Sequence, residues 1–134
     1  MIFDSINPLS VLVAAAAAFA LGALWYLPEV FGAPWMAALH KQPKDLRAPL
    51  VPMSVSAVLL LVTAYALAIV VVAFDLFVWW EGAAMGLMVG LMFVAPAMLS
   101  DYLFAGWPRV LFAIQAGYRV LALGVMGAIL GAWH

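Results

Sequence analysis

Four long apolar stretches alternate along this chain with shorter segments that hold nearly all of the charged residues. A helix rises about 1.5 Å per residue, so about 20 residues match the roughly 30 Å hydrocarbon core of a bilayer. We therefore predict an all-α fold: an integral membrane bundle of four transmembrane helices with short connectors, the whole chain 1–134 forming a single transmembrane domain. The predicted spans are residues 8–27, 52–74, 82–99 and 109–133.

The first predicted span has boundary signals at both ends. Asn7 and Pro8 are an N-cap residue followed by proline at the first helical position. Trp25 and Tyr26 form an aromatic pair suited to the headgroup boundary, and Pro28 stops or kinks the helix. We expect one or two turns of interfacial helix in the connector that follows. Its apolar side would consist of Phe31, Trp35, Met36 and Leu39, with Lys41, Lys44 and Arg47 among the headgroups.

Composition excludes a soluble fold. Hydrophobic residues make up 70% of the chain and charged residues 8%, and the mean hydropathy is +1.21. A soluble domain has about 45–50% apolar and about 25% charged residues. A chain of this size buries only about two-thirds of its surface on folding, so much apolar surface would face water. Membrane lipid is therefore the expected environment.

Other features exclude whole classes of function. The net charge of −1 gives no field to attract nucleic acid, and the absence of cysteine excludes disulfides, thiolate metal sites and iron–sulfur clusters. His40 and His134 fall on opposite membrane faces of the predicted topology, so they cannot share a metal or haem. No serine has a base at a recognisable spacing. We expect no metal, no cofactor, no nucleic acid partner and no catalytic residue, and hence a protein that is not an enzyme.

The positive charges indicate the orientation. All five Lys and Arg residues lie in the first-to-second connector or on the side of the third-to-fourth connector. Cytoplasmic loops carry an excess of Lys and Arg. Connectors 28–51 and 100–108 are therefore expected on the cytoplasmic side and both termini on the outer side. The alternative is that five charges are too few to decide.

Small residues recur at four-residue intervals on three of the predicted helices. In lipid, helices associate through close packing at small residues and through polar contacts. These stripes either pack helices within one bundle or form the interface of a homo-oligomer. The stripes are Ala14, Ala18 and Gly22; Gly82, Gly86 and Gly90; and Gly127 with Gly131.

Arg119 lies about 16 Å along the last predicted helix, near the middle of the bilayer. Arginine at a helix centre costs about 2.5–3.5 kcal/mol on insertion scales, and such residues usually face the bundle interior or snorkel. Gln115 is one turn earlier on the same face, Tyr118 is adjacent, and Arg109 marks the start of the helix. The last helix therefore carries a polar stripe.

Partners for Arg119 must be acidic or carbonyl groups on the same side of the membrane. We hypothesise a buried polar cluster beneath the two connectors, which is either an ion pair that pins helix ends or a binding site for a ligand or ion. A third possibility places residues 110–117 in the interface and Arg119 at the headgroups. The hypothetical cluster consists of Glu29, Asp101, Gln115 and Arg119, with Tyr26 and Tyr102 beside them.

Several motifs together resemble one family. They are Gly22-Ala-Leu-Trp-Tyr26, Pro28, Phe31-Gly32 and Trp35, then Asp101-Tyr102, Leu111-Phe112, Gly117-Tyr118 and Met126-Gly-Ala-Ile-Leu-Gly131. Over nearly its whole length the chain resembles the domain-of-unknown-function family numbered 1761, which are small, mostly bacterial membrane proteins. The resemblance implies four helices in a bacterial cytoplasmic (inner) membrane, and no activity. The family commonly has a serine and a lysine where this chain has Leu27 and Ala33.

Three functions were weighed. The first is a non-enzymatic structural or accessory subunit of a larger membrane complex, or a homo-oligomer, with other transmembrane helices as partners. The lack of extramembrane mass and of a catalytic constellation favours it. The second is a small transporter or channel for an ion or metabolite that uses the cluster around Arg119. The third, a membrane enzyme acting on lipid, would need a reactive interfacial group, and only Glu29, His40 and Asp101 qualify, none of them convincingly paired.

Overall fold

The computed structural model describes residues 2–38 and 50–134, and all regular structure in these two ranges is helical, as predicted. Leu39, His40, Lys41, Lys44 and Arg47, which entered the sequence predictions, lie outside the described residues. The elements are η1 (Ile2–Ser5), α1 (Pro8–Trp25), the π-helical turn η2 (Pro28–Gly32), α2 (Ala33–Ala38), α3 (Leu50–Ala73), α4 (Trp79–Val89), the π-helical turn η4 (Gly90–Val94), α5 (Ala95–Ala105) and α6 (Arg109–Ala132).

Four helical segments are long and apolar enough to cross a membrane. Elements α4, η4 and α5 form one continuous segment, which is longer than the predicted span 82–99. It extends to Ala105 because no residue that breaks a helix lies between Leu99 and Gly106, whose positive φ of 72° ends it. The four segments are Pro8–Trp25, Val51–Ala73, Trp79–Ala105 and Arg109–Ala132.

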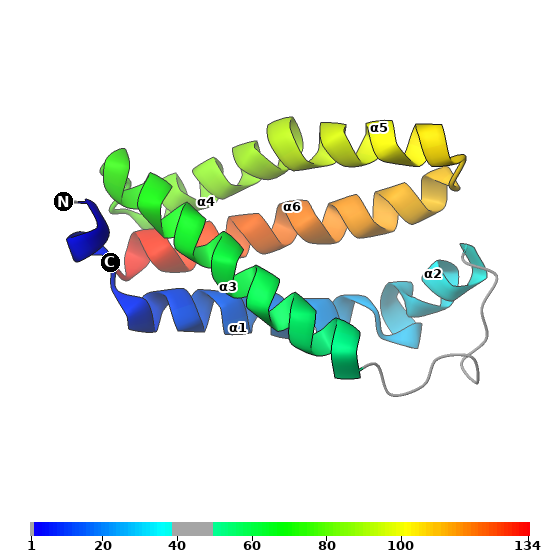
Figure 1. The fold of residues 1–134 in the computed structure, drawn as a ribbon, viewed down its shortest axis with the longest axis horizontal. Helices are drawn as coiled ribbons and strands as arrows, with labels where there is room; N and C mark the ends of the chain where they lie inside the picture. Colours follow the sequence, from blue (N-terminus) through cyan, green and yellow to red (C-terminus); the bar gives the residue numbers. More distant parts are fainter. Residues whose placement is uncertain (1, 39–49) are drawn as a thin grey trace.

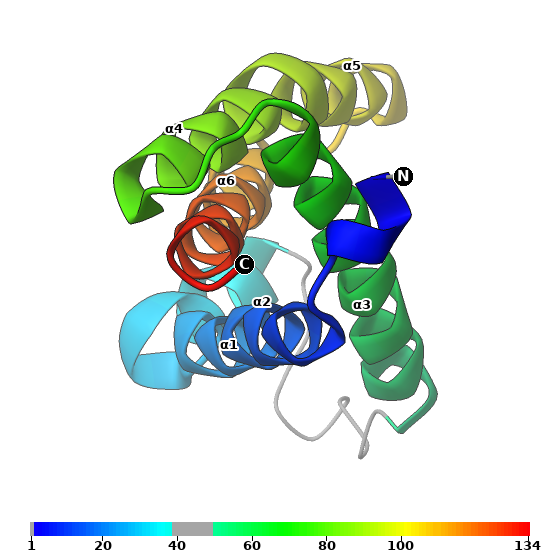
Figure 2. The same cartoon turned by 90° about the vertical axis from the view of Figure 1, so that its left-hand side faces the viewer.

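The four segments run alternately up and down, so that both termini lie at one end of the bundle (Figure 1). Helix α2, which follows α1, and the turn between α5 and α6 lie at the other end. Seen from the end that carries the termini, α6 lies between α4 and α1, and α3 crosses on the side (Figure 2). The core forms where α1, α3 and α6 meet, with Ala14, Ala18 and Ala64 fully buried.

The predicted start of the first helix is confirmed. Asn7 caps α1 through its side-chain oxygen, which accepts a hydrogen bond of 3.0 Å from the backbone N–H of Leu9, and Pro8 occupies the first turn. This cap satisfies one of the N–H groups that a helix start leaves unpaired. Ser10 on the same turn donates to the carbonyl of Asn7 at 2.8 Å.

The glycine stripes of α4 and α6 bring these two helices into backbone contact. A β-carbon at Gly82 would collide with the carbonyl oxygen of Gly127, and one at Gly86 would collide with that of Leu123. A β-carbon at Gly131 would likewise collide with the carbonyl oxygen of Val78, although less severely. The α4–α6 contact is the most extensive in the protein, so these stripes pack helices within one chain.

The π-helical turn η4 has a local cause. Pro96, at the start of α5, has no N–H to donate and its ring would clash with the carbonyl four residues earlier. The wider turn before it avoids this clash, and Ala95 donates instead to the carbonyl of Gly90, five residues back. The segment Trp79–Ala105 therefore continues through Pro96 as one helix without a break.

Candidate functional site

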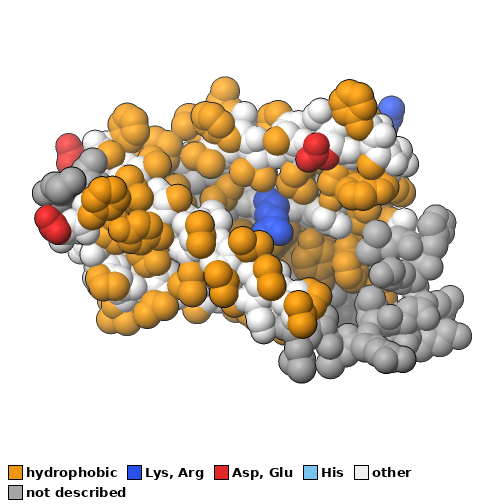
Figure 3. All heavy atoms as spheres, in the orientation of Figure 1, with side chains coloured by type: hydrophobic (Ala, Val, Ile, Leu, Met, Phe, Trp, Pro, Cys, Tyr) orange, Lys and Arg blue, Asp and Glu red, His pale blue; other side chains and the backbone are white. Residues whose placement is uncertain are grey.

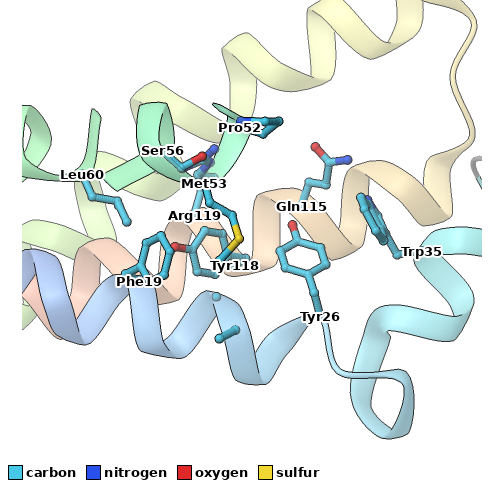
Figure 4. Close-up of a pocket in the computed structure, with 12 residues that line it drawn as sticks. Phe19, Tyr26, Trp35, Pro52, Met53, Ser56, Leu60, Gln115, Tyr118 and Arg119 are labelled. Carbon is cyan, nitrogen blue, oxygen red and sulfur yellow. The ribbon is translucent and has the colours of Figure 1, made fainter. Parts of the chain in front are cut away.

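A cavity of about 370 Å³ lies between α1, α3 and α6 in the half of the bundle that holds the connectors. Figure 3 shows a basic side chain on this face of the molecule, surrounded by hydrophobic side chains. Both polar and apolar side chains line the cavity (Figure 4). The polar lining is Tyr26, Trp35, Ser56, Gln115, Tyr118 and Arg119; the apolar lining is Phe19, Gly22, Ala23, Pro52, Met53 and Leu60.

Arg119 supplies the positive charge of this cavity. It is the eleventh residue of the unbroken helix α6, about 15 Å from its first residue. Its guanidinium carbon lies 5.4 Å from the ring centroid of Tyr118, within the range of a cation–π contact. The side chain is exposed to the cavity, and no acidic residue in the ranges 2–38 and 50–134 forms an ion pair with it.

Tyr118 fixes the floor of the cavity. Its ring is buried, and its hydroxyl donates a hydrogen bond of 2.9 Å to the carbonyl of Ala18 on α1. Gly22, one turn further along α1, leaves room for this ring, because a β-carbon there would lie 3.0 Å from the Tyr118 hydroxyl. The small residues of α1 therefore make room for the Tyr118 ring, and Arg119 is the next residue of α6.

Gln115 is held by a neighbour outside the cavity. The Tyr102 hydroxyl on α5 donates to Gln115 Oε1 at 2.6 Å. Tyr102 is itself buried against Trp107 and Phe112, with ring centroids 4.9 and 5.8 Å away. The amide oxygen accepts this hydrogen bond, and the two N–H donors of the amide remain available to a group in the cavity.

Tyr26 and Trp35 close the connector end of the cavity. The Tyr26 ring packs edge-on against Trp35 and Tyr118, with centroids 5.2 and 5.9 Å apart. Burial raises the pKa of Tyr26 to about 12, although the charge of Arg119 acts in the opposite direction. The phenol is therefore a neutral donor at physiological pH. The indole Nε1 of Trp35 is buried and has no hydrogen-bond partner in the described part of the chain.

Trp25 ties α1 to α6 at the same end. Its Nε1 donates to the carbonyl of Ile114 at 2.9 Å, and its ring packs on Phe31 at a centroid distance of 4.6 Å. The predicted role of Trp25 and Tyr26 as a headgroup anchor is therefore accompanied by contacts within the bundle that position α6.

The structure brings together part of the hypothetical cluster. Gln115, Tyr118 and Arg119 line the cavity as a single face of α6, with Tyr26 opposite. Glu29 and Asp101 do not join them: both are exposed, neither lines the cavity, and neither forms an ion pair with Arg119. In α5 the buried residue is Tyr102, and a helix turns about 100° per residue, so the adjacent Asp101 leaves the interface.

Arg109, the remaining predicted residue, begins α6 outside the cavity and is exposed. Sequence reasoning missed the contributions of α3 and α2, namely Ser56, Met53 and Trp35. Ser56 is one of the few polar residues of α3, with Ser54, Thr63 and Tyr65, and its polarity alone does not distinguish it from them. Within residues 2–38 and 50–134, no group of three or more His, Asp or Glu side chains could hold a metal ion.

Comparison with known proteins gives a family and no function. The family model described as "Protein of unknown function (DUF1761)" matches residues 9–131. No curated protein and no solved structure matches the chain. The match extends over most of the sequence and confirms the resemblance drawn from the motifs around Trp25, Trp35 and Tyr118. The chain therefore belongs to the DUF1761 family.

Proposed function

We propose that this chain is a multi-pass integral membrane protein that binds a small ligand, without transforming it, in the cavity around Arg119. One observation carries the proposal: a guanidinium without an ion-pair partner among the described residues lines an open cavity of about 370 Å³ on the side of an apolar bundle. Pockets of about 300–1,000 Å³ with few convergent polar groups are typical of small-molecule sites. An unpaired charge in such surroundings is costly and usually functional.

The outer surface supports insertion into lipid. Large hydrophobic side chains are exposed along all four segments, the most exposed being Phe104 at 92%. Such a surface would aggregate in water, whereas lipid covers it without cost. Asp75 and Glu81 lie at the end that carries the termini, and Arg109 at the opposite end, so Arg119 alone among them has a position far from either end.

The orientation is proposed from the sequence and the alternating path of the chain. Helix α2 and the turn between α5 and α6 lie at one end of the bundle, and we assign this end, with the predicted connectors 28–51 and 100–108, to the cytoplasmic side of a bacterial inner membrane. The termini then lie on the outer side. The cavity opens in the cytoplasmic half.

A role as accessory subunit or homo-oligomer stays a prediction with less support. The glycine stripes that suggested a self-interface, Gly82 with Gly86 and Gly127 with Gly131, are occupied by the α4–α6 contact. Ligand binding has the more specific support, and it is also the first step that a small transporter would need. The absence of catalysis is proposed because the cavity residues supply hydrogen-bond donors and a fixed charge, without a paired nucleophile and base.

The test is whether a ligand occupies this cavity. The protein would be purified from its native membrane in a non-ionic detergent and examined by native mass spectrometry. Ala23→Trp places a large side chain at the cavity wall without removing any polar group, and Ala66→Trp makes the same change on an exposed position of α3 away from the cavity. We expect wild type and Ala66→Trp to retain a bound small molecule and Ala23→Trp to lose it. Equal retention by all three would refute the proposed site.

A further inference from the structure

We infer that the ligand is an anionic amphiphile drawn from the bilayer, with an oxyanion head group such as a carboxylate or phosphate beside Arg119 and an apolar body against α1 and α3. The inference rests on the proposed function and adds the chemical class of the ligand.

Arg119 has no counter-ion among the described residues. Glu29 and Asp101, the acidic residues on this side that the structure describes, are exposed and form no ion pair with it, and Asp45 lies outside the described residues. The contact with the Tyr118 ring compensates only part of the cost of a cation away from water, because a cation–π contact is weaker than an ion pair of good geometry. A ligand anion would complete the charge balance that the described residues leave open.

Several groups around the Arg119 guanidinium are hydrogen-bond donors. Arg and Trp side chains donate only, so Arg119 and Trp35 accept nothing. The Gln115 oxygen accepts from the Tyr102 hydroxyl, and the two N–H donors of the same amide remain available to a ligand.

Tyr26 adds a phenol O–H at the same end of the cavity (Figure 4). Trp35 also lines the cavity, and its buried Nε1–H has no partner in the described part of the chain. A set of donors around one cation suits an oxyanion and disfavours a cationic ligand.

The apolar part of the cavity lining indicates how a ligand reaches the cavity. The lining also contains Phe19, Met53 and Leu60, which offer no hydrogen bonds and suit a hydrocarbon body. The cavity lies within the apolar segments of α1, α3 and α6, and the face that carries it is otherwise hydrophobic (Figure 3). A ligand reaching it sideways from the hydrocarbon region would itself be amphiphilic, which favours a lipid or fatty acid over a free aqueous anion.

The test titrates the delipidated protein with defined probes by native mass spectrometry in a non-ionic detergent. The probes are decanoate, decyl phosphate, decanol and inorganic phosphate. Decanol has the apolar body without the charge, and inorganic phosphate has the charge without the body. We expect the two anionic amphiphiles to bind at one site that Ala23→Trp blocks. Decanol and inorganic phosphate should each bind about tenfold more weakly or worse.

The matched variants are Arg119→Gln and Arg109→Gln, which remove the same charge from the same helix inside and outside the cavity. Arg119→Gln should weaken binding of decanoate about tenfold or more and leave that of decanol unchanged. Arg109→Gln should leave both unchanged. Arg119→Lys, which keeps the charge, should recover part of the affinity, and circular dichroism with size-exclusion chromatography verifies that each variant is folded.

The results separate the two proposals. If Ala23→Trp removes the co-purified ligand but Arg119→Gln binds decanoate as wild type does, the anionic assignment is overturned and the cavity remains a ligand site. Binding of decanol as tight as that of decanoate, or of inorganic phosphate as tight as that of decyl phosphate, also overturns it, as does failure of every probe to bind. If Ala23→Trp changes nothing, the site itself is wrong.

Discussion

The hydroxyl of Tyr118 donates a hydrogen bond of 2.9 Å to the backbone carbonyl of Ala18, joining α6 to α1 across 100 residues of sequence. The same ring lies 5.4 Å from the guanidinium carbon of Arg119. One aromatic side chain thus connects the packing of two helices to the position of the charge in the cavity. Removing its hydroxyl should affect the first role while leaving the ring contact in place.

Tyr118→Phe is expected to lower the free energy of unfolding by about 0.5–1.5 kcal/mol. The cost is modest because the Ala18 carbonyl keeps its place in the helix, and only the inter-helix bond is lost. Thermal or denaturant unfolding in detergent measures the change. Tyr65→Phe, at an exposed position of α3, is the control and should change little. A loss from Tyr118→Phe no larger than from the control would show that the bond does not stabilise the bundle.

Gly82→Ala should destabilise the protein by about 1–3 kcal/mol or more, because the added β-carbon collides with the carbonyl of Gly127 and the two backbones must separate. Ala84→Leu adds more atoms to the same helix, but at an exposed position, and should be nearly neutral. Unfolding in detergent compares the two variants. If Ala84→Leu were the more damaging change, the α4–α6 contact would be misassigned.

Tyr102→Phe should loosen Gln115 without altering any residue of the cavity lining. The variant lacks the 2.6 Å bond that fixes Gln115 Oε1, so the amide can turn its oxygen towards the ligand. We expect the affinity for decanoate to fall about two- to fivefold, because one hydrogen bond to the carboxylate is weakened without being lost. Combining Tyr102→Phe with Gln115→Ala should give no further loss beyond Gln115→Ala alone; additive losses would mean that Tyr102 acts by another route.

Tyr26 should make stability depend on pH in the alkaline range. Burial raises its pKa from 10.0 to about 12, so the unfolded chain releases this proton before the folded protein does. The stability associated with the protonated phenol is complete below pH 10 and is lost as the pH rises towards about 12. Across this pH range, the free energy of unfolding should decline less steeply in Tyr26→Phe than in wild type. Identical slopes would contradict the burial of the phenol.

Local patterns predicted the parts of the structure that depend on short stretches of sequence. Asn7 and Pro8 were sufficient to place the start of α1. The four-residue spacing of Gln115 and Arg119 placed them on one helix face, and both line the cavity. In each case the observation concerns only neighbours within a turn or two of helix, where geometry is set by the chain itself.

Contacts between distant segments were not predictable in the same way. The sequence suggested that Arg119 meets Glu29 and Asp101 because opposite charges attract, but the rotation of α5 that buries Tyr102 points Asp101 elsewhere. Trp35 and Ser56 join the cavity only through the crossing of α3 and the turn into α2, which no local pattern encodes. Asp101 also suggested too early an end for the third segment, since an exposed charge does not stop a helix before Gly106.

The central prediction is that the chain crosses the bilayer four times, so that its N-terminus and its 100–108 connector lie on opposite sides. The sequence contains no cysteine, so single cysteines can be introduced without background. Labelling of Ser5→Cys, Ala105→Cys and Val62→Cys with a membrane-impermeant maleimide in intact and permeabilised cells gives the most direct test. We predict labelling of Ser5→Cys in intact cells, of Ala105→Cys only after permeabilisation, and of Val62→Cys in neither. Labelling of Ser5→Cys and Ala105→Cys from the same side, or ready labelling of Val62→Cys, would contradict the four crossings.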